Sequence, residues 1–161
     1  MEILQGGRGE QLLDQPRRSR LRMRLKELTP AELHRLAEGR AVVRRYAAVP
    51  RARTRLTGLL TPAGTDVLTD PLVASRFGLA VIDGDTRLEG YFAGDRGALQ
   101  RRLRLTSAPE GDVTIRYVTD DLSVEHLYGT DALTALDLMD SDDIRERAAG
   151  RDVLERLLGR V

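Results

Sequence analysis

The N-terminal part of the chain has the hydrophobic spacing of a helix. Leu21, Leu25 and Leu28 are separated by four and three positions, which places them on one face of a helix that begins near Arg17. Cationic side chains occupy much of the rest of this helix. The preceding residues, 1–16, contain several glycines and little periodicity, so we expect a flexible tail there.

A second helix is predicted directly afterwards by its start and stop signals. Thr29 is a typical N-cap, Pro30 suits the first helical position, and Glu32 completes a capping box. Gly39 is a typical C-terminal stop. We therefore expect a short helix between Thr29 and Gly39.

Residues 41–49 fit either a strand or a helix, and the sequence does not decide between them. Pro50 ends whichever element forms, because the residue before a proline is driven out of the helical region. In residues 51–55 arginine alternates with small residues, which predicts an extended basic strand. A helix over 31–38 followed by a ribbon over Arg44–Arg55 is compatible with a fragment of a winged-helix unit.

A β-hairpin is predicted near the middle of the chain. Residues 77–82 are apolar and read as a buried strand, and Asp83-Gly84 is a strong signal for a tight hairpin turn. Residues 86–93 follow as the second strand. A helix capped by Asp95 comes next, with Leu99 on its apolar face.

The C-terminal part is predicted to add one strand and two helices. Apolar and polar residues alternate over 113–117, which indicates a half-buried strand. Residues 131–139 and 142–158 have helical periodicity, and Ser141 or Asp142 is expected to cap the second of these helices.

These elements predict an α+β fold. We expect a basic, mainly helical region over 17–60, followed by an α/β domain over 61–161. In that domain a small mixed sheet, formed by the hairpin, the helix and the last strand, would be covered by the two C-terminal helices.

Composition and charge divide the 161-residue chain in the same way. Residues 1–61 contain 14 Lys and Arg against 6 Asp and Glu, a balance of +8, whereas residues 62–161 contain the remaining 12 basic and 19 acidic residues, a balance of −7. The chain has no cysteine, which excludes disulfides, thiolate metal sites and cysteine nucleophiles. No apolar run approaches the roughly 18 residues of a membrane span, and no secretory signal is visible, so we expect a cytoplasmic protein without a membrane role.

Candidate catalytic and metal sites are not evident in the sequence. His34 and His126 are the only histidines, and neither lies in a metal-binding spacing. Asp83-Gly84-Asp85 has the paired carboxylates of a Mg²⁺ site, but the hairpin turn explains this run fully. No nucleophile elbow and no phosphate-binding loop with Gly-Lys-Ser/Thr occurs. We therefore expect neither catalysis, nor a cofactor, nor a bound metal.

The basic segment carries the main functional signal. Arginine donates two hydrogen bonds to phosphate at once, and neutralising phosphates releases counterions, so nucleic acid, with DNA as the preferred candidate, is the predicted partner. The alternatives are a solvated basic face and a protein-interaction module that docks an acidic surface or a second copy of the chain. The predicted nucleic-acid-binding residues are Arg17, Arg18, Arg20, Arg22, Arg24, Lys26, Arg44, Arg45, Arg51, Arg53 and Arg55.

The pattern of apolar blocks and turns over about residues 55–158 resembles a known family. The stretches that carry it are RLTGLL (55–60), DPLVAS (70–75), LEGYF (88–92), DVTIR (112–116), ALTALDL (132–138) and RERAAG (145–150). They are similar to actinobacterial regulators of the AbiEi type, the antitoxins of type IV toxin–antitoxin systems. The resemblance implies a bacterial transcriptional regulator with an N-terminal winged helix for operator DNA and a C-terminal domain that represses or antagonises a toxin. It transfers no site residues.

Overall fold

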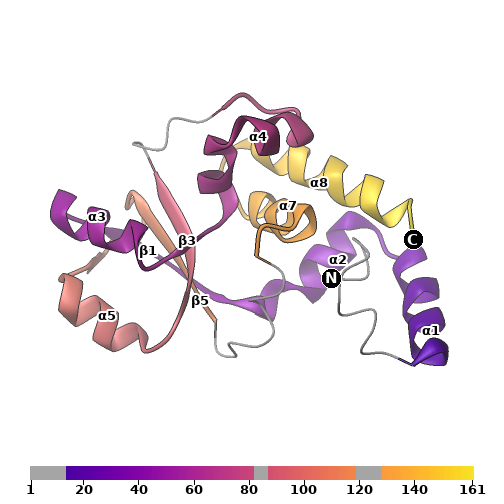
Figure 1. Ribbon diagram of the computed structural model, residues 1–161, viewed down its shortest axis with the longest axis horizontal. Helices are drawn as coiled ribbons and strands as arrows, with labels where there is room; N and C mark the ends of the chain where they lie inside the picture. The colour runs from indigo at the N-terminus through magenta and orange to yellow at the C-terminus, as the bar shows by residue number, and fades with distance from the viewer. Residues whose placement is uncertain (1–13, 82–86, 119–127) are drawn as a thin grey trace. The chain divides into compact units, whose positions relative to one another are not determined.

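The structure, a computed structural model, describes residues 14–81, 87–118 and 128–161, and it consists of two compact units (Figure 1). One unit comprises residues 1–38 and 129–161, and the other comprises residues 39–128. The fold is α+β, as predicted. The units divide the basic region that was expected over 17–60, since its first part belongs with the C-terminal helices and its second part with the sheet.

The first unit is helical. Its helices are α1 (Gln15–Lys26), α2 (Pro30–Leu36), α7 (Asp131–Met139) and α8 (Ile144–Leu158). The predicted capping box of α2 is confirmed: the Thr29 amide donates to Glu32 Oε2 at 2.8 Å, and the Glu32 amide donates to Thr29 Oγ1 at 3.3 Å. Two hydrogen bonds from Thr29 to the Glu32 carboxylate, first the one from the Thr29 amide and then the one from its hydroxyl, lower the pKa of this carboxyl.

Helices α7 and α8 form the core of this unit because they approach each other closely. A Cβ at Gly150 would lie 2.5 Å from the carbonyl oxygen of Ala135, so only glycine permits this packing. The N-cap of α8 is Asp143, whose carboxylate accepts from the Arg145 amide at 2.6 Å. The prediction of Ser141 or Asp142 as the cap was therefore wrong, although Ser141 Oγ accepts from the Asp143 amide at 3.0 Å.

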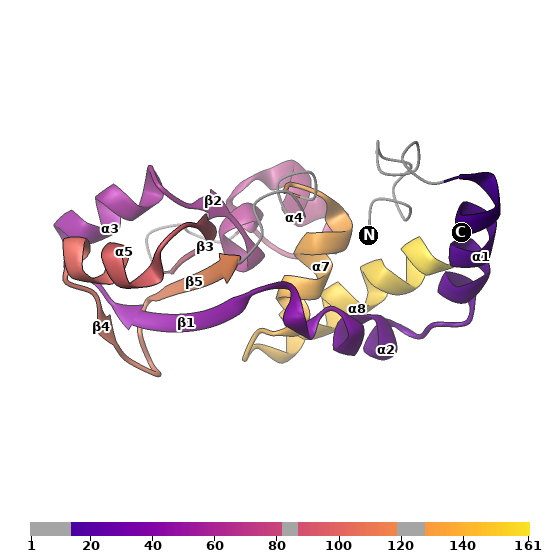
Figure 2. The same cartoon turned by 90° about the horizontal axis from the view of Figure 1, so that it is seen from below.

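The second unit contains a five-stranded sheet in the order β2-β3-β5-β1-β4 (Figure 2). Strands β3 and β5 are parallel, and the other neighbours are antiparallel. The elements of this unit are β1 (Val42–Ala47), α3 (Pro50–Thr57), β2 (Thr61–Pro62), η4 (Gly64–Thr69), α4 (Pro71–Phe77), β3 (Leu88–Ala93), α5 (Arg96–Leu103), β4 (Thr106–Ser107) and β5 (Val113–Val118), and the short helix η3 (Glu38–Arg40) precedes them.

Two predictions in this unit change. Residues 41–49 contain the strand β1, which resolves the ambiguity in favour of a strand, but residues 51–55 form helix α3 and not the extended basic strand that was predicted. Pro50 stands at the start of α3, and Ala52 and Leu56, four residues apart, are buried on one face of it. The helical spacing of these apolar residues outweighs the alternation of the arginines. The ribbon predicted over Arg44–Arg55 as part of a winged-helix unit is therefore extended only in its first part, in β1, and is helical from Pro50 onward.

The first strand of the predicted hairpin is also absent from residues 77–81. Phe77 is the last residue of α4, and Gly78 ends that helix in the left-handed conformation with φ 65°. The apolar run is used partly as a buried helix end, since Phe77 is buried. The turn Asp83-Gly84 lies outside the described residues. Strand β3 and the Asp95-capped helix α5 are confirmed, with the Ala98 amide donating to Asp95 Oδ1 at 2.7 Å.

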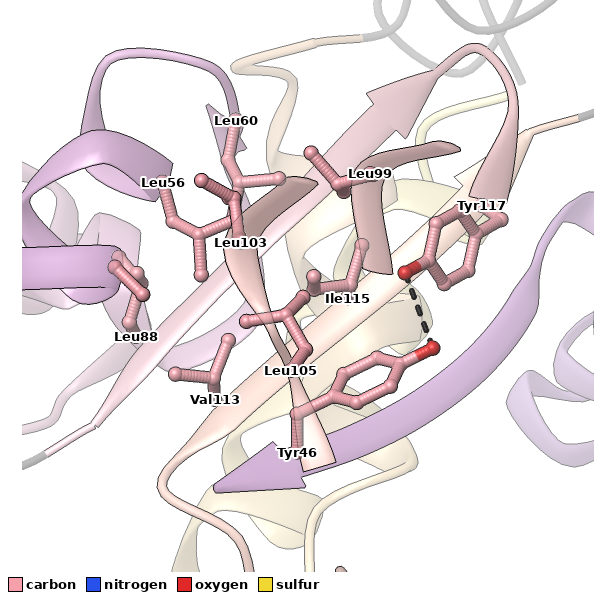
Figure 3. Packing of buried hydrophobic residues seen from close by; sticks show 11 residues of the cluster. Tyr46, Leu56, Leu60, Leu88, Leu99, Leu103, Leu105, Val113, Ile115 and Tyr117 are labelled. Carbon is pink, nitrogen blue, oxygen red and sulfur yellow. Dashed lines mark hydrogen bonds between the residues drawn. The ribbon is translucent and has the colours of Figure 1, made fainter. Parts of the chain in front are cut away.

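Helices α3 and α5 cover one face of the sheet (Figures 2 and 3). Leu56 of α3 and Leu103 of α5 pack with the inward residues of β5, among them Ile115. Strand β5 was predicted to be half-buried, but it lies between β3 and β1 and almost all of its residues are buried. Arg116 is among these buried residues, with 2% of its surface exposed. Because successive side chains of a strand point to opposite faces, it lies on the face of the sheet away from Ile115.

Candidate nucleic-acid interface

The N-terminal cations lie on α1 in two rows. By the helical period, Arg17, Arg20 and Arg24 fall on one side of the leucine face. Arg18, Arg22 and Lys26 fall on the other side, and these three line a surface groove together with Gln15, Ser19, Met23 and Val161. Leu25 on the leucine face is buried and anchors the helix in its unit.

The cations of α1 differ in how far they are engaged with the protein. Arg17 Nε lies 3.8 Å from Asp14 Oδ2, and Arg20 Nε donates to the carbonyl of Pro16 at 3.3 Å. Arg18 is half-buried, whereas the other basic residues of the helix are exposed. The helix therefore presents a solvated cationic surface, of which Arg18, Arg22 and Lys26 share one groove.

The two arginines of β1 do not join a common surface. Arg44 and Arg45 are adjacent in the strand, so their side chains point to opposite faces of the sheet. Arg44 Nη1 donates to the carbonyl of Val43 at 2.9 Å, and Arg45 Nη1 donates to that of Pro109 at 3.5 Å. Both bonds hold the guanidinium groups against the backbone.

Arg53 is held by the protein itself. Its Nη1 lies 2.7 Å from Oδ2 of Asp112, and the same nitrogen donates to the Asp112 carbonyl at 3.5 Å. Arg53 also acts on the nearby Asp66, whose pKa is raised by burial and lowered in part by the Arg53 charge. Of the predicted residues in α3, Arg53 is thus structural, since it ties the helix to the loop before β5.

Four arginines line one groove between α3 and α5, with a volume of about 400 Å³. Arg51 and Arg55 come from α3, and Arg102 and Arg104 come from the end of α5. All four are exposed. The groove is completed by three apolar residues, Val49, Ala52 and Leu103.

The groove arginines have no counter-charge of their own. Among the residues that the structure describes, none accepts a side-chain hydrogen bond from Arg51, Arg55, Arg102 or Arg104 or forms an ion pair with one of them. The first turn of α3 has no acidic residue, and its N-cap, Val49, has no side chain that can accept from the helix amides. The positive end of the helix dipole therefore adds to the charge of Arg51. This arrangement raises the potential at the groove and favours an anion.

Arg104 has an unusual backbone. Its φ of 52° places it in the left-handed region, and it is the only non-glycine residue with positive φ in the described part of the chain. Helix α5 ends there in a Schellman-type turn, in which the Leu105 amide donates to the Gln100 carbonyl at 3.1 Å. Leu103 and Leu105, on either side of Arg104, are buried. The turn thus fixes the direction in which the Arg104 side chain leaves the surface.

The sequence analysis selected Arg51 and Arg55 but not Arg102 and Arg104. The local signal was present, because arginine occupies three of the four positions from 101 to 104. What the sequence could not supply was the packing of α5 beside α3, which brings the end of one helix to the start of the other.

The histidines and carboxylates of the described regions do not gather in a metal-binding arrangement. No group of three or more His, Asp or Glu side chains is placed to hold a metal ion within residues 14–81, 87–118 and 128–161. His34 Nε2 lies 2.6 Å from Asp140 Oδ1 and links α2 to the end of α7, while His126 lies outside the described residues. None of the helices in the described ranges has both the length and the apolar character needed to cross a bilayer.

Comparison with known proteins gives no match: no family model fits the chain, and no curated protein or solved structure was found to be similar to it.

Proposed function

We propose that this protein binds nucleic acid through phosphate contacts and catalyses no reaction on it. The observation that carries the proposal is the groove that Arg51, Arg55, Arg102 and Arg104 line together with three apolar residues. The groove beside α1, lined by Arg18, Arg22 and Lys26, adds a second cationic surface.

The physical argument is electrostatic. Guanidinium groups that share a groove without protein carboxylates repel one another, and they gain when a polyanion replaces the small counterions. The guanidinium fork also matches phosphate oxygens in shape. The outcome is binding that depends on phosphates and that weakens as salt rises.

Fluorescence anisotropy with a labelled DNA duplex tests the proposal. We expect affinity to fall steeply between about 50 and about 200 mM salt, with a log–log slope of about −0.9 for each phosphate contacted. The double variant R51E/R55E is expected to lower the affinity by about tenfold or more and to reduce the slope by about 2. Absent binding at low salt, or binding that does not respond to salt, would contradict the proposal.

A matched variant separates the groove from the net charge. R96E/R101E makes the same change in charge, on helix α5, at positions that do not line the groove. We expect it to weaken binding much less than R51E/R55E. Equal losses would indicate a diffuse charge effect and no groove.

The biological role that we propose is that of an antitoxin-like transcriptional regulator in the bacterial cytoplasm, with DNA as the nucleic acid. The support is the resemblance to AbiEi-type regulators together with the cationic groove. A protein partner such as a toxin, or a second copy of the chain, is part of this proposal. Anisotropy against duplex DNA and against RNA of the same sequence tests the choice of nucleic acid, and equal affinity for both would count against a DNA-directed regulator.

A further inference from the structure

We infer that the groove between α3 and α5 is a discrete phosphate site, in which Arg104 is the residue that fixes the position of the phosphate. The inference rests on the proposed function, because it assumes that the bound phosphate is part of a nucleic acid. It goes further, because a diffuse basic face would bind a polyanion without holding any one phosphate in place.

At the C-terminal end of α5, Arg104 occupies a left-handed backbone position that favours glycine. Helix α4 in the same unit ends in the same left-handed conformation, and there the residue is Gly78, with φ 65°. Helix α5 instead ends with Arg104 at φ 52°. A side chain in this conformation brings Cβ too close to the backbone, and glycine avoids the strain.

Among the described residues, no hydrogen bond or ion pair of the Arg104 side chain explains its presence by stability. It is exposed, and no described residue offers it a hydrogen bond or a carboxylate. Its charge adds to that of Arg51, Arg55 and Arg102 in the same groove. Favourable interaction with the negative end of the α5 dipole is already available to Arg101 and Arg102 in the last turn. A bound anion accounts for a fourth cation at a strained position.

The turn at the end of α5 also sets the direction of the Arg104 side chain. Leu103 and Leu105 are buried on either side of Arg104, and the Arg104 amide donates to the Arg101 carbonyl at 3.4 Å. The Cα–Cβ bond is therefore held by the packed turn, so that only the rotamers of the side chain remain free. Such an anchored arginine, with the others around it, can meet several oxygens of one phosphate.

The ligand chemistry is that of a phosphate group in a nucleic acid. An internal phosphodiester carries one charge, whereas a terminal phosphomonoester carries nearly two and has one more free oxygen. Both present tetrahedral oxygens to the four arginines. The two sources are separated by oligonucleotides with and without a 5′-phosphate.

Nuclear magnetic resonance of the full chain with inorganic phosphate tests the site without nucleic acid. At constant ionic strength, we expect the amide signals of residues 49, 51–55 and 102–105 to shift and saturate along one binding curve, while those of α1 move little. Shifts of equal size over all basic surfaces, or no saturable shift, would overturn the inference.

Substitutions at the end of α5 provide the second test. R104G removes the guanidinium and relieves the strain, R104K keeps a charge but loses the planar fork, and R101A removes one charge from the same helix outside the groove. Loss of a charge-assisted bond corresponds to about tenfold in affinity for R104G. We expect an intermediate loss for R104K, little loss for R101A, and a melting temperature of R104G no lower than that of the wild type.

The outcomes separate the inference from the proposed function. Equal losses for R104G and R101A in a wild-type protein that binds DNA would overturn the discrete site and leave nucleic-acid binding standing. Saturable phosphate shifts in a protein that binds no oligonucleotide would support the site and reject the proposed function. A gain in affinity from a 5′-phosphate, abolished by R104G, identifies a terminal phosphate, whereas equal affinities that both fall in R104G identify an internal one.

Discussion

Arg116 Nη2 donates to Oε1 of Glu89 at 2.5 Å, and the pair is enclosed against the sheet with Arg116 only 2% exposed. The Arg116 Nε donates to the same oxygen at 3.1 Å. The other oxygen of Glu89 accepts from the Thr65 amide at 3.1 Å and from its hydroxyl at 3.3 Å. The pair therefore joins β3, β5 and η4 through a carboxylate whose two oxygens are both occupied.

Removal of the Glu89 charge is expected to destabilise the second unit strongly. E89Q leaves the Arg116 cation buried without its counter-charge, and breaking a buried pair in this way costs about 3–5 kcal/mol. Chemical denaturation monitored by circular dichroism measures this cost. The exposed Glu110 provides the control, since E110Q should change the free energy of unfolding by less than about 0.5 kcal/mol. A loss in E89Q as small as that in E110Q would show that the pair contributes little.

Three glycines should respond to alanine in a graded way. Gly39 has open space around it and no positive φ, Gly78 has φ 65° with open space, and Gly64 combines φ 52° with close contact to the Glu89 carboxylate. We expect little effect for G39A, about 1 kcal/mol of destabilisation for G78A from backbone strain alone, and more than about 2 kcal/mol for G64A. The order of the three midpoints in urea is the measurement, and a G64A variant as stable as G78A would argue against the close contact.

The hydroxyl groups of Tyr46 and Tyr117 are expected to be coupled (Figure 3). Tyr117 donates to Tyr46 at 3.1 Å in the core, and burial is the main cause that raises the pKa of Tyr117. Either single change to phenylalanine leaves one buried hydroxyl without this partner and costs about 1–3 kcal/mol. The double change removes both polar groups, so we expect it to be less destabilising than the sum of the singles. A double-mutant cycle of unfolding free energies measures the coupling, and additive losses would show that none exists.

The pH dependence of stability is expected to include a contribution from Asp66. Burial raises the pKa of this carboxyl above its ordinary value of 3.8, against the opposing effects of the Arg53 charge and the Glu89 amide. The folded state therefore holds the proton more tightly than the unfolded state. The stability that Asp66 contributes is fully present below the unfolded pKa, and it is lost as pH rises through the folded pKa.

D66N should consequently raise the melting temperature at pH 7, where the wild-type side chain is charged and half-buried. The difference between the two proteins should shrink as pH falls towards about 4, because the wild-type carboxyl then takes up its proton. Thermal unfolding of both proteins across this range is the measurement. A D66N protein that is less stable than the wild type at pH 7 would contradict the sign of the effect.

Arg53 is expected to behave differently from its neighbours in α3. Because it is paired with Asp112, R53A should lower stability while changing the affinity for DNA by less than about twofold. R55A, which removes an unpaired groove residue, should lower affinity and leave stability within about 0.5 kcal/mol. Anisotropy and thermal unfolding on the same samples measure both effects. Equal losses of affinity would place Arg53 in the interface.

Local signals in the sequence predicted most of the helices. The capping box of α2 and the Asp95 cap of α5 act between residues three apart, so the sequence contains both partners. Helix α3 was missed because alternation of its arginines imitates a strand, and the burial of Ala52 and Leu56 is decided by the sheet beneath them. The apolar run 77–82 was predicted to be a strand because a short apolar run fits a buried strand as well as a helix end. Gly78 was the signal that a helix ends there.

The candidate site was predictable only in part. An arginine-rich segment indicated where cations lie along the chain, but it could not show that Arg53 is paired with Asp112. Nor could it show that Arg102 and Arg104, about fifty positions away, come to the same groove as Arg51 and Arg55. Both facts depend on the packing of α3 and α5 on the sheet.

Strand β1 has a practical consequence for dividing the chain. It supplies the segment between β5 and β4, with Val43 opposite Arg116 and Tyr46 opposite Ser107. A fragment that starts at residue 61 would leave β5 with an open ladder of amides and carbonyls along its length, and such an edge invites aggregation. Isolated production of the sheet-bearing half should therefore begin upstream of residue 42.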